Sequence, residues 1–389
     1  MAIITIIPAM AGIIGTIITI TIIIVDMATI ITDKIYISIP KARAGQALQI
    51  GNAFLLSLIF LLPGCFSPAR SAPSIEETQN AKVPISGIYY FGYQGLDLDK
   101  IKETVPLKIN DKVDTMSLLQ KRDQYFKDTI DLVGKPLTDV ALVSTLNGSV
   151  LFIGLPGKSN SEMQTYLPVG KKRVSPPAEI AKTYREYMAK LTPYLQAPDQ
   201  KKKLEMKSLQ EQMKQQSISK RAELRRSLLE SSDGLDRGVA AYALGLVAME
   251  PADFEALTRA ANDSSSLVRN NATRELGELI QAKPELAAKV PAHAIETYVD
   301  MINSRTWTDR NKAIFMVIDL TKTRNQKVLA LLKAKALPSL REMCLWPEGY
   351  AQPALQLIGR IGGIPATELD KMVEQNKTDE ILKSVSVPL

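Results

Sequence analysis

Cysteine, histidine and carboxylate side chains could do chemistry in this chain, but they are few or scattered. The sequence has two cysteines, Cys65 and Cys344, and a single histidine, His293. A zinc site or a Cys/His nucleophile pair needs several such groups at defined spacing, which this chain does not have. Asp, Glu and Lys occur throughout, but no spacing pairs them with a base or a metal ligand. The sequence therefore predicts no catalytic residue, no metal and no cofactor, and a protein that is not an enzyme.

Cys65 lies at the end of the second of two apolar runs near the N-terminus. The first run holds no charge up to Val25, and the second, "ALQIGNAFLLSLIFLLPGCF", follows Lys41 and Arg43. The favoured interpretation is a secretory signal whose start lies inside this sequence, with the two cations as its n-region. The alternative is an integral inner-membrane protein with membrane helices over 3–25 and 47–63.

The end of the second run resembles the lipobox of bacterial lipoproteins, in which the cysteine becomes the lipidated first residue of the mature protein. Leu62, Gly64 and Cys65 match that pattern, whereas Pro63 departs from the small or aliphatic residue that is usual there. Cleavage nearby, around "SPARSAPS", is the alternative. The resemblance implies export to the cell envelope, either periplasmic or anchored at the outer membrane, with Cys65 as the lipidation candidate and the N-terminus as the membrane contact.

Shifts in composition and patterning divide the chain into segments. We expect an apolar membrane or signal region (1–65), a linker (66–82), an α+β domain (83–157), a second linker (158–175), a basic helical segment (176–230), helical repeats (231–365) and a C-terminal helix or tail (366–389).

Residues 83–157 show the order strand, helix, helix, strand, strand. "VPISGIYYFGY" alternates and is rich in β-branched and aromatic residues, which is typical of a strand. A short helix follows, and then a longer one from about Asp114 to Gly134, a residue suited to end a helix. Two apolar runs flanking Asn147-Gly148 predict a hairpin. The longer helix offers five residues to the core: Met116, Leu119, Tyr125, Phe126 and Ile130.

This segment resembles a POTRA module, as found in outer-membrane assembly proteins, two-partner secretion transporters and cell-division septum proteins. The resemblance rests on Ile85, Ile88 and Gly92, on "KINDKV" at 108–113 and on "GKPLTDV" at 134–140. POTRA-like domains bind partners, often by adding a strand to an exposed sheet edge. The resemblance implies such an edge here, and the alternative is an unrelated small α+β domain.

From Pro176 the pattern is helical, and residues 201–226 are strongly basic. A field of a single sign could attract phosphates or an anionic membrane. The stretch interleaves no aromatic residues and has no Gly-rich loop, so a solvated helix face is favoured over a nucleic-acid site. Binding of an anionic membrane through 201–226 stays open as an alternative.

The last part of the chain contains a recurring unit. Each instance has a small residue three positions, and a larger one seven positions, after its first residue, which places both on one helix face. The small residue lets a neighbouring helix approach, and an apolar helical segment precedes each unit. The first positions are 32, 41 and 41 residues apart. The four instances are Arg237, Ala240 and Leu244; Arg269, Ala272 and Leu276; Arg310, Ala313 and Val317; and Ala351, Ala354 and Ile358.

The unit resembles a HEAT repeat, best in "LTRAANDSSSLVRNNATRELGEL", with Leu257, Asp263 and Arg269 at the family positions. The fourth unit lacks the arginine and contains Pro353, so it is a cap or a degenerate repeat. The resemblance implies a solenoid with an extended binding surface and a structural role for the arginines. An irregular helical bundle is the alternative. The expected fold class is α+β overall, with a small βααββ POTRA-like domain followed by an all-α HEAT-like solenoid.

The favoured function is a non-catalytic interaction scaffold, exported or membrane-anchored, that binds a protein partner in the cell envelope through the solenoid and the sheet edge. Trp307 and Trp346, near inter-helix turns, are candidate partner anchors, with core packing as the other possibility. A second hypothesis is a lyase-type enzyme, because HEAT-like repeats also occur in phycobilin lyases, which hold a ligand in the solenoid groove. Nucleic acid is not expected as a partner.

Overall fold

The computed structural model describes residues 2–8, 18–24, 83–145, 148–161, 166–196 and 199–385. The chain forms two compact units, residues 1–81 and 82–389. In the first unit, β1 (Ala2–Pro8) pairs with β2 (Ile18–Ile24) in an antiparallel register that joins Ala2 to Ile24. The suggested membrane helix over 3–25 is therefore wrong in these residues, which are strands. Cys65 and the run 47–63 lie outside the described residues. Within the described ranges, no helix combines the length and apolarity that a membrane crossing requires.

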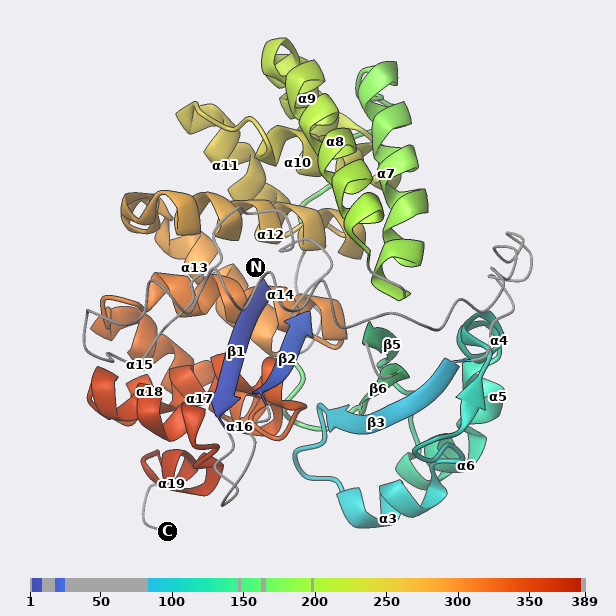
Figure 1. Ribbon diagram of the computed structural model, residues 1–389, viewed down its shortest axis with the longest axis vertical. Coiled ribbons are helices and arrows are strands. Elements are labelled where there is room, and N and C mark those ends of the chain that lie inside the picture. The colour runs from blue at the N-terminus through green and yellow to red at the C-terminus, as the bar shows by residue number, and fades with distance from the viewer. Residues whose placement is uncertain are drawn as a thin grey trace, which may run out of the picture. The chain divides into compact units, whose positions relative to one another are not determined.

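The second unit is mostly helical and carries one four-stranded mixed sheet, so the α+β class expected from the sequence is confirmed (Figure 1). The strand order is β4–β3–β6–β5. β3 runs parallel to β6 and antiparallel to β4, and β5 and β6 form the expected antiparallel hairpin. The strands are β3 (Val83–Phe91), β4 (Lys112–Val113), β5 (Asp139–Thr145) and β6 (Gly148–Gly154).

The expected long helix between the strands is divided into three short ones. It begins as predicted after Asp114, whose side chain accepts the backbone N–H of Ser117, and it ends at Gly134 with φ of 71°. The backbone leaves helical geometry at Lys121 and at Phe126, which redirects the chain and turns Tyr125 to solvent while Phe126 enters the core. The expectation that Tyr125 packs inside is therefore wrong. The helices of this part are α3 (Leu98–Thr104), α4 (Thr115–Gln120), α5 (Arg122–Tyr125) and α6 (Lys127–Val133).

Both faces of the sheet are covered, which explains why β6 is a continuous apolar run rather than an alternating one. Alternate side chains of a strand point to opposite faces. Leu151 and Ile153 join the core beneath α3 to α6, and Phe152 between them packs against aromatic rings of the later helices. The sheet is therefore a layer shared by two cores.

The remaining helices stack in chain order from α9 to α17, each inner helix packing on the next (Figure 1). α10, α12, α14 and α17 carry the four sequence units, and α9, α11, α13 and α15 precede them on the outer side. Bounds are α7 (Ala178–Gln196), α8 (Gln200–Ser217), η2 (Ile218–Lys220), α9 (Arg221–Glu230), α10 (Gly234–Gly245), α11 (Pro251–Ala260), α12 (Ser266–Ala282), η3 (Pro284–Lys289), α13 (Ala292–Ile302), α14 (Trp307–Leu320), α15 (Gln326–Lys335), α16 (Leu337–Met343), α17 (Glu348–Ile361), α18 (Ala366–Glu374) and α19 (Thr378–Lys383).

Two features shape the stack of inner helices: a close approach of α10 and α12, and insertions that lengthen two of the repeat intervals. α10 and α12 approach closely because Gly238 and Gly245 lie on one helix face, and a Cβ at Gly245 would lie 2.2 Å from the Cβ of Glu275. Between α12 and α13 the chain inserts η3, and between α14 and α17 it inserts the extra helix α16. These insertions account for the longer second and third intervals.

Candidate binding surfaces

An arginine ladder links consecutive helical units through buried ion pairs. Arg237 on α10 binds Asp263 in the turn before α12, with Nε–Oδ2 and Nη2–Oδ1 distances of 2.7 and 2.8 Å. Arg269 on α12 binds Asp309 on α14 in the same two-pronged way, at 3.0 and 2.7 Å. These geometries are the favourable bidentate form of an arginine–carboxylate pair.

Each arginine of the ladder also fixes the turn of its own unit. The guanidinium donates to the backbone carbonyl six residues earlier, and this contact is repeated at Ser231, Asp263 and Ser304 for Arg237, Arg269 and Arg310. The repetition of one contact in three units makes the units structurally equivalent. All of the repeat positions named from the sequence are buried: Arg237, Ala240, Leu244, Arg269, Ala272, Leu276, Arg310, Ala313, Val317, Ala351, Ala354 and Ile358.

In the segment 158–175, expected to be a linker, the described residues 158–161 and 166–175 bind along the same edge of the helical stack, and we call them the strap. The backbone N–H of Ser161 donates to Asn303, and that of Leu167 donates to Asn262. Further on, Lys172 pairs with Ser231 in an isolated bridge. The strap therefore touches one inter-helix turn after another, from the third unit back to the first.

The strap supplies an arginine for Asp236, the acid of the first unit, which has no preceding unit to provide one. Asp236 precedes Arg237 as Asp309 precedes Arg310, but no earlier unit offers it a partner. Arg173 of the strap takes that place, with its Nε 2.7 Å from Oδ2 of Asp236. The Arg173 guanidinium holds the pKa of the Asp236 carboxyl below its usual range. Nothing in the sequence pattern pointed to Arg173, because its partner lies 63 residues away.

The third rung of the ladder joins the helices to the sheet. Glu342 on α16 accepts the backbone N–H groups of Gly92, Tyr93 and Gln94 at 2.6, 2.9 and 3.1 Å. Its carboxylate also lies 3.4 Å from Nη1 of Arg310, whose side chain is fully buried. Burial lowers the pKa of Arg310 to about 10. The loop after β3 is thus held by a charged acceptor, the strong form of hydrogen bond.

The two tryptophans pack at this junction. Trp307 and Trp346 are only 7% and 5% exposed, and both lie against Phe152, with ring centroids 4.9 and 5.1 Å apart. Nε1 of Trp346 donates to the carbonyl of Tyr90, which closes part of the free edge of β3. Their suggested role as exposed partner anchors is not met in this structure, because the sheet already covers both rings.

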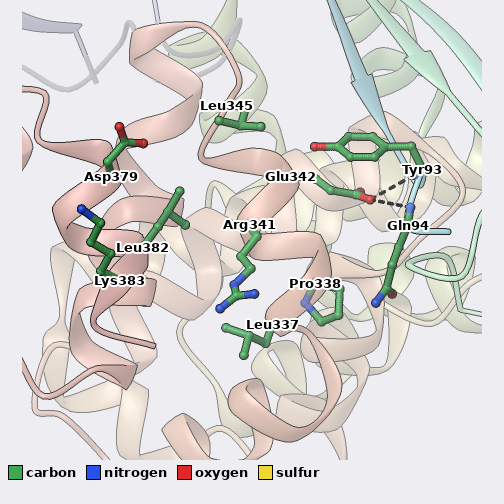
Figure 2. Close-up of a pocket in the computed structure, with 10 residues that line it drawn as sticks. All are labelled: Tyr93, Gln94, Leu337, Pro338, Arg341, Glu342, Leu345, Asp379, Leu382 and Lys383. Atoms are coloured by element: carbon green, nitrogen blue, oxygen red, sulfur yellow. Dashed lines mark hydrogen bonds between the residues drawn. The ribbon is translucent and has the colours of Figure 1, made fainter. Parts of the chain in front are cut away.

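A hollow of about 600 Å³, the seam pocket, lies where the sheet domain meets α16 and α19 (Figure 2). Figure 2 shows Arg341 between Leu337 and Leu382, and Glu342 turned away toward the loop after β3. Burial raises the pKa of Tyr93 at the edge of the pocket to about 12. The lining combines apolar side chains with two cations and two carboxylates. The lining residues are Tyr93, Gln94, Leu337, Pro338, Arg341, Glu342, Leu345, Asp379, Leu382 and Lys383.

A second hollow of about 610 Å³, the outer groove, lies among α11, the end of α12, η3 and the start of α13. Its floor includes Phe254, Leu279 and Leu286, and Met249 at its side is 77% exposed. His293 lines it too, at the start of α13. No sequence pattern indicated this groove, because its lining residues lie as far apart along the chain as Leu167 and Thr297.

The basic stretch 201–226 is partly neutralised. Arg221 and Arg225 on α9 reach Glu250 at 2.8 and 3.0 Å, and Arg225 also binds Asp253, which is fully buried. Arg226 and Lys220 likewise pair with Glu230 and Glu223, at 3.2 and 2.9 Å. Much of this charge therefore serves helix packing rather than forming one free basic face.

Cys344 is buried, and burial raises the pKa of its thiol. In the part of the chain that the structure describes, no cluster of three or more His, Cys, Asp or Glu side chains could hold a metal ion. The search of protein-family models and the search of curated proteins return no match for this chain.

Proposed function

We propose that this protein is a non-catalytic interaction scaffold that holds a protein partner on its helical stack. The observation that carries the proposal is the outer groove, in which apolar side chains stay accessible on a frame made rigid by the arginine ladder. Monomeric proteins seldom leave a contiguous apolar hollow uncovered without an interaction to fill it.

We further propose that α9 to α17 are HEAT-like repeats. The support is the repeated contact of each first-turn arginine with its own turn and with the acid of the next unit. In such a stack each unit contacts mainly its neighbours and the assembly presents long, continuous surfaces. The absence of an arginine in the fourth unit agrees with its position at the end of the ladder.

For the sheet, the POTRA-like assignment is supported by the order strand, helices, hairpin and by the central place of the last strand, β6. The open edge that a partner strand would join is β5, because Trp346 and Glu342 close much of the other side at the end of β3. α7 and α14 lie near β5, so a partner strand there would also touch the helical stack.

The proposed location is the cell envelope, with export directed by the second apolar run and lipidation at Cys65. The test is the intact mass of the mature product from a bacterial host, together with fractionation. A chain that begins at an acylated Cys65 supports an anchored scaffold. A chain that begins near Ala72 without lipid supports a free exported one, and an uncleaved chain from Met1 contradicts the export proposal.

Site-directed photo-cross-linking in cells tests the scaffold itself. A photoreactive residue at Met249, in the outer groove, is compared with one at Leu204 on α8, which is similarly exposed at 57% but lies outside the groove. We expect a discrete protein adduct from Met249 and none from Leu204. A Met249 variant that folds and yields no adduct would contradict the proposal.

A second candidate function is binding of a small molecule, as in the lyase-type hypothesis, and the seam pocket favours it. Its apolar side chains, with charged groups of both signs beside them, suit a small amphipathic molecule. Native mass spectrometry of the purified chain tests this. A copurified small molecule that is retained by the unaltered chain and lost in Leu345→Glu would support the small-molecule function. A chain that carries no small molecule would contradict it and would not affect the scaffold proposal.

A further inference from the structure

We propose that the outer groove binds an acidic amphipathic segment of the partner, with apolar residues on its floor and Asp or Glu side chains along its rim. This inference rests on the proposed scaffold function and adds the chemistry of the partner.

The groove exists because α11 and α13 are kept apart. Elsewhere on the outer side, α9 packs on α11 and α13 packs on α15. Between α11 and α13 the chain instead places η3, which rests on α12 and α14, and the described residues show no comparably close packing of these two helices. Phe254 of α11 and Leu279 of α12 remain only partly covered.

The charged side chains around the groove leave a positive excess. Glu250 is already bound by Arg221 and Arg225 of α9, so its charge is offset within the fold. Arg259, Lys283 and Lys289 are exposed at the rim, and none of them is within 4.0 Å of a carboxylate of the described chain. Glu255 is the remaining acid at the rim. Three free cations against one free acid give the site a net positive field. This field attracts an acidic segment, repels a basic one and adds nothing to the binding of a neutral one.

The arrangement of the groups favours a peptide over a single ion or a lipid headgroup. The cations are distributed over α11, the end of α12 and the end of η3, around an apolar floor, rather than converging on one point. A phosphate would engage at most a few of them and leave Phe254 and Leu286 uncovered. An amphipathic segment engages floor and rim together, as in helix-in-groove recognition.

Selection from a displayed library of random peptides tests this directly, with the purified full chain as bait. We expect enriched peptides that combine Leu, Ile, Phe or Met with two or more Asp or Glu. Enrichment of neutral or basic peptides, or no enrichment, would overturn the inference.

Charge-reversal variants then locate the binding. The double variant Arg259→Glu/Lys289→Glu should weaken the best enriched peptide by about tenfold or more. Lys333→Glu, an exposed lysine on α15 outside the groove, is the matched control and should bind as the unaltered chain does. Equal binding by the double variant and the control would refute the groove as the site.

The failures of the two proposals are distinguishable. If Met249 cross-links to a partner but the adduct persists in Arg259→Glu/Lys289→Glu, the scaffold proposal is retained and the proposal of an acidic segment is refuted. If neither cross-linking nor peptide selection finds a ligand, both fall.

Discussion

Glu342→Ala tests whether one carboxylate holds the sheet domain to the helical stack. The substitution removes the acceptor for the backbone N–H groups of Gly92 and Tyr93 and one of two acceptors for that of Gln94, which also donates to Ser159 Oγ. It also removes the counter-charge of Arg310, which is 0% exposed. Leaving a buried charge without its partner typically costs about 3–5 kcal/mol. Each stranded N–H adds about 1–3 kcal/mol if it stays dry. Water entering the vacated space will solvate some of these groups, so we expect a loss of about 3–5 kcal/mol in the free energy of unfolding.

Intrinsic fluorescence is a specific assay for this loss, because the only two tryptophans of the chain, Trp307 and Trp346, both pack at the junction. In urea, the fluorescence transition of Glu342→Ala should move to lower denaturant and precede the loss of helical circular dichroism. A loss of this size is large against the total stability of about 5–15 kcal/mol that is usual for a domain. Glu342→Gln keeps one amide oxygen as an acceptor, so its fluorescence transition should lie between those of the unaltered chain and Glu342→Ala.

The matched control is Glu374→Ala, which removes an exposed carboxylate from α18. It should unfold with the unaltered chain. If Glu342→Ala instead gives a fluorescence transition superimposable on that of Glu374→Ala, the carboxylate clamp does not stabilise the junction and the reasoning is refuted.

Three further predictions concern buried groups. Burial raises the pKa of Glu275 to about 8, so the protonated form is favoured in the folded state and stability should fall as pH rises from about 4.5 to about 8; Glu275→Gln should flatten that dependence in thermal unfolding curves, and an unchanged slope would contradict it. Gly277→Ala, whose added Cβ meets nothing within 4 Å, should stabilise α12 by about 0.5–1 kcal/mol in urea unfolding. Gly245→Ala, whose Cβ would collide with Glu275, should instead destabilise by about 1–3 kcal/mol, and equal effects of the two would show that helix propensity alone decides. Cys344 should react with a thiol reagent only after denaturation in a Cys65→Ser chain, since its thiol is buried and its pKa is raised; rapid labelling of the native form would show that α16 opens.

Local pattern was sufficient for much of this fold. The alternation of residues 83–91 specified a strand, Asp114 and Gly134 marked where the helical stretch begins and ends, and Asn147-Gly148 marked the hairpin. Arg269, Ala272 and Leu276 identified the repeated unit, because helix periodicity and small-residue spacing depend only on neighbours along the chain.

The sequence by itself determined the order of strand, helical stretch and hairpin in 83–154 and the buried face of each inner helix, but not the division into α4, α5 and α6 or the insertions η3 and α16. Only the tertiary structure decided that Glu342 binds the loop after β3, that Arg173 of the strap completes the ladder at Asp236, and that the sheet covers Trp307 and Trp346. It also decided that η3 keeps two outer helices apart and leaves a groove. The physical reason is that these contacts join residues tens to hundreds of positions apart, and an ion pair or an aromatic contact at that separation leaves no periodic trace in a single sequence.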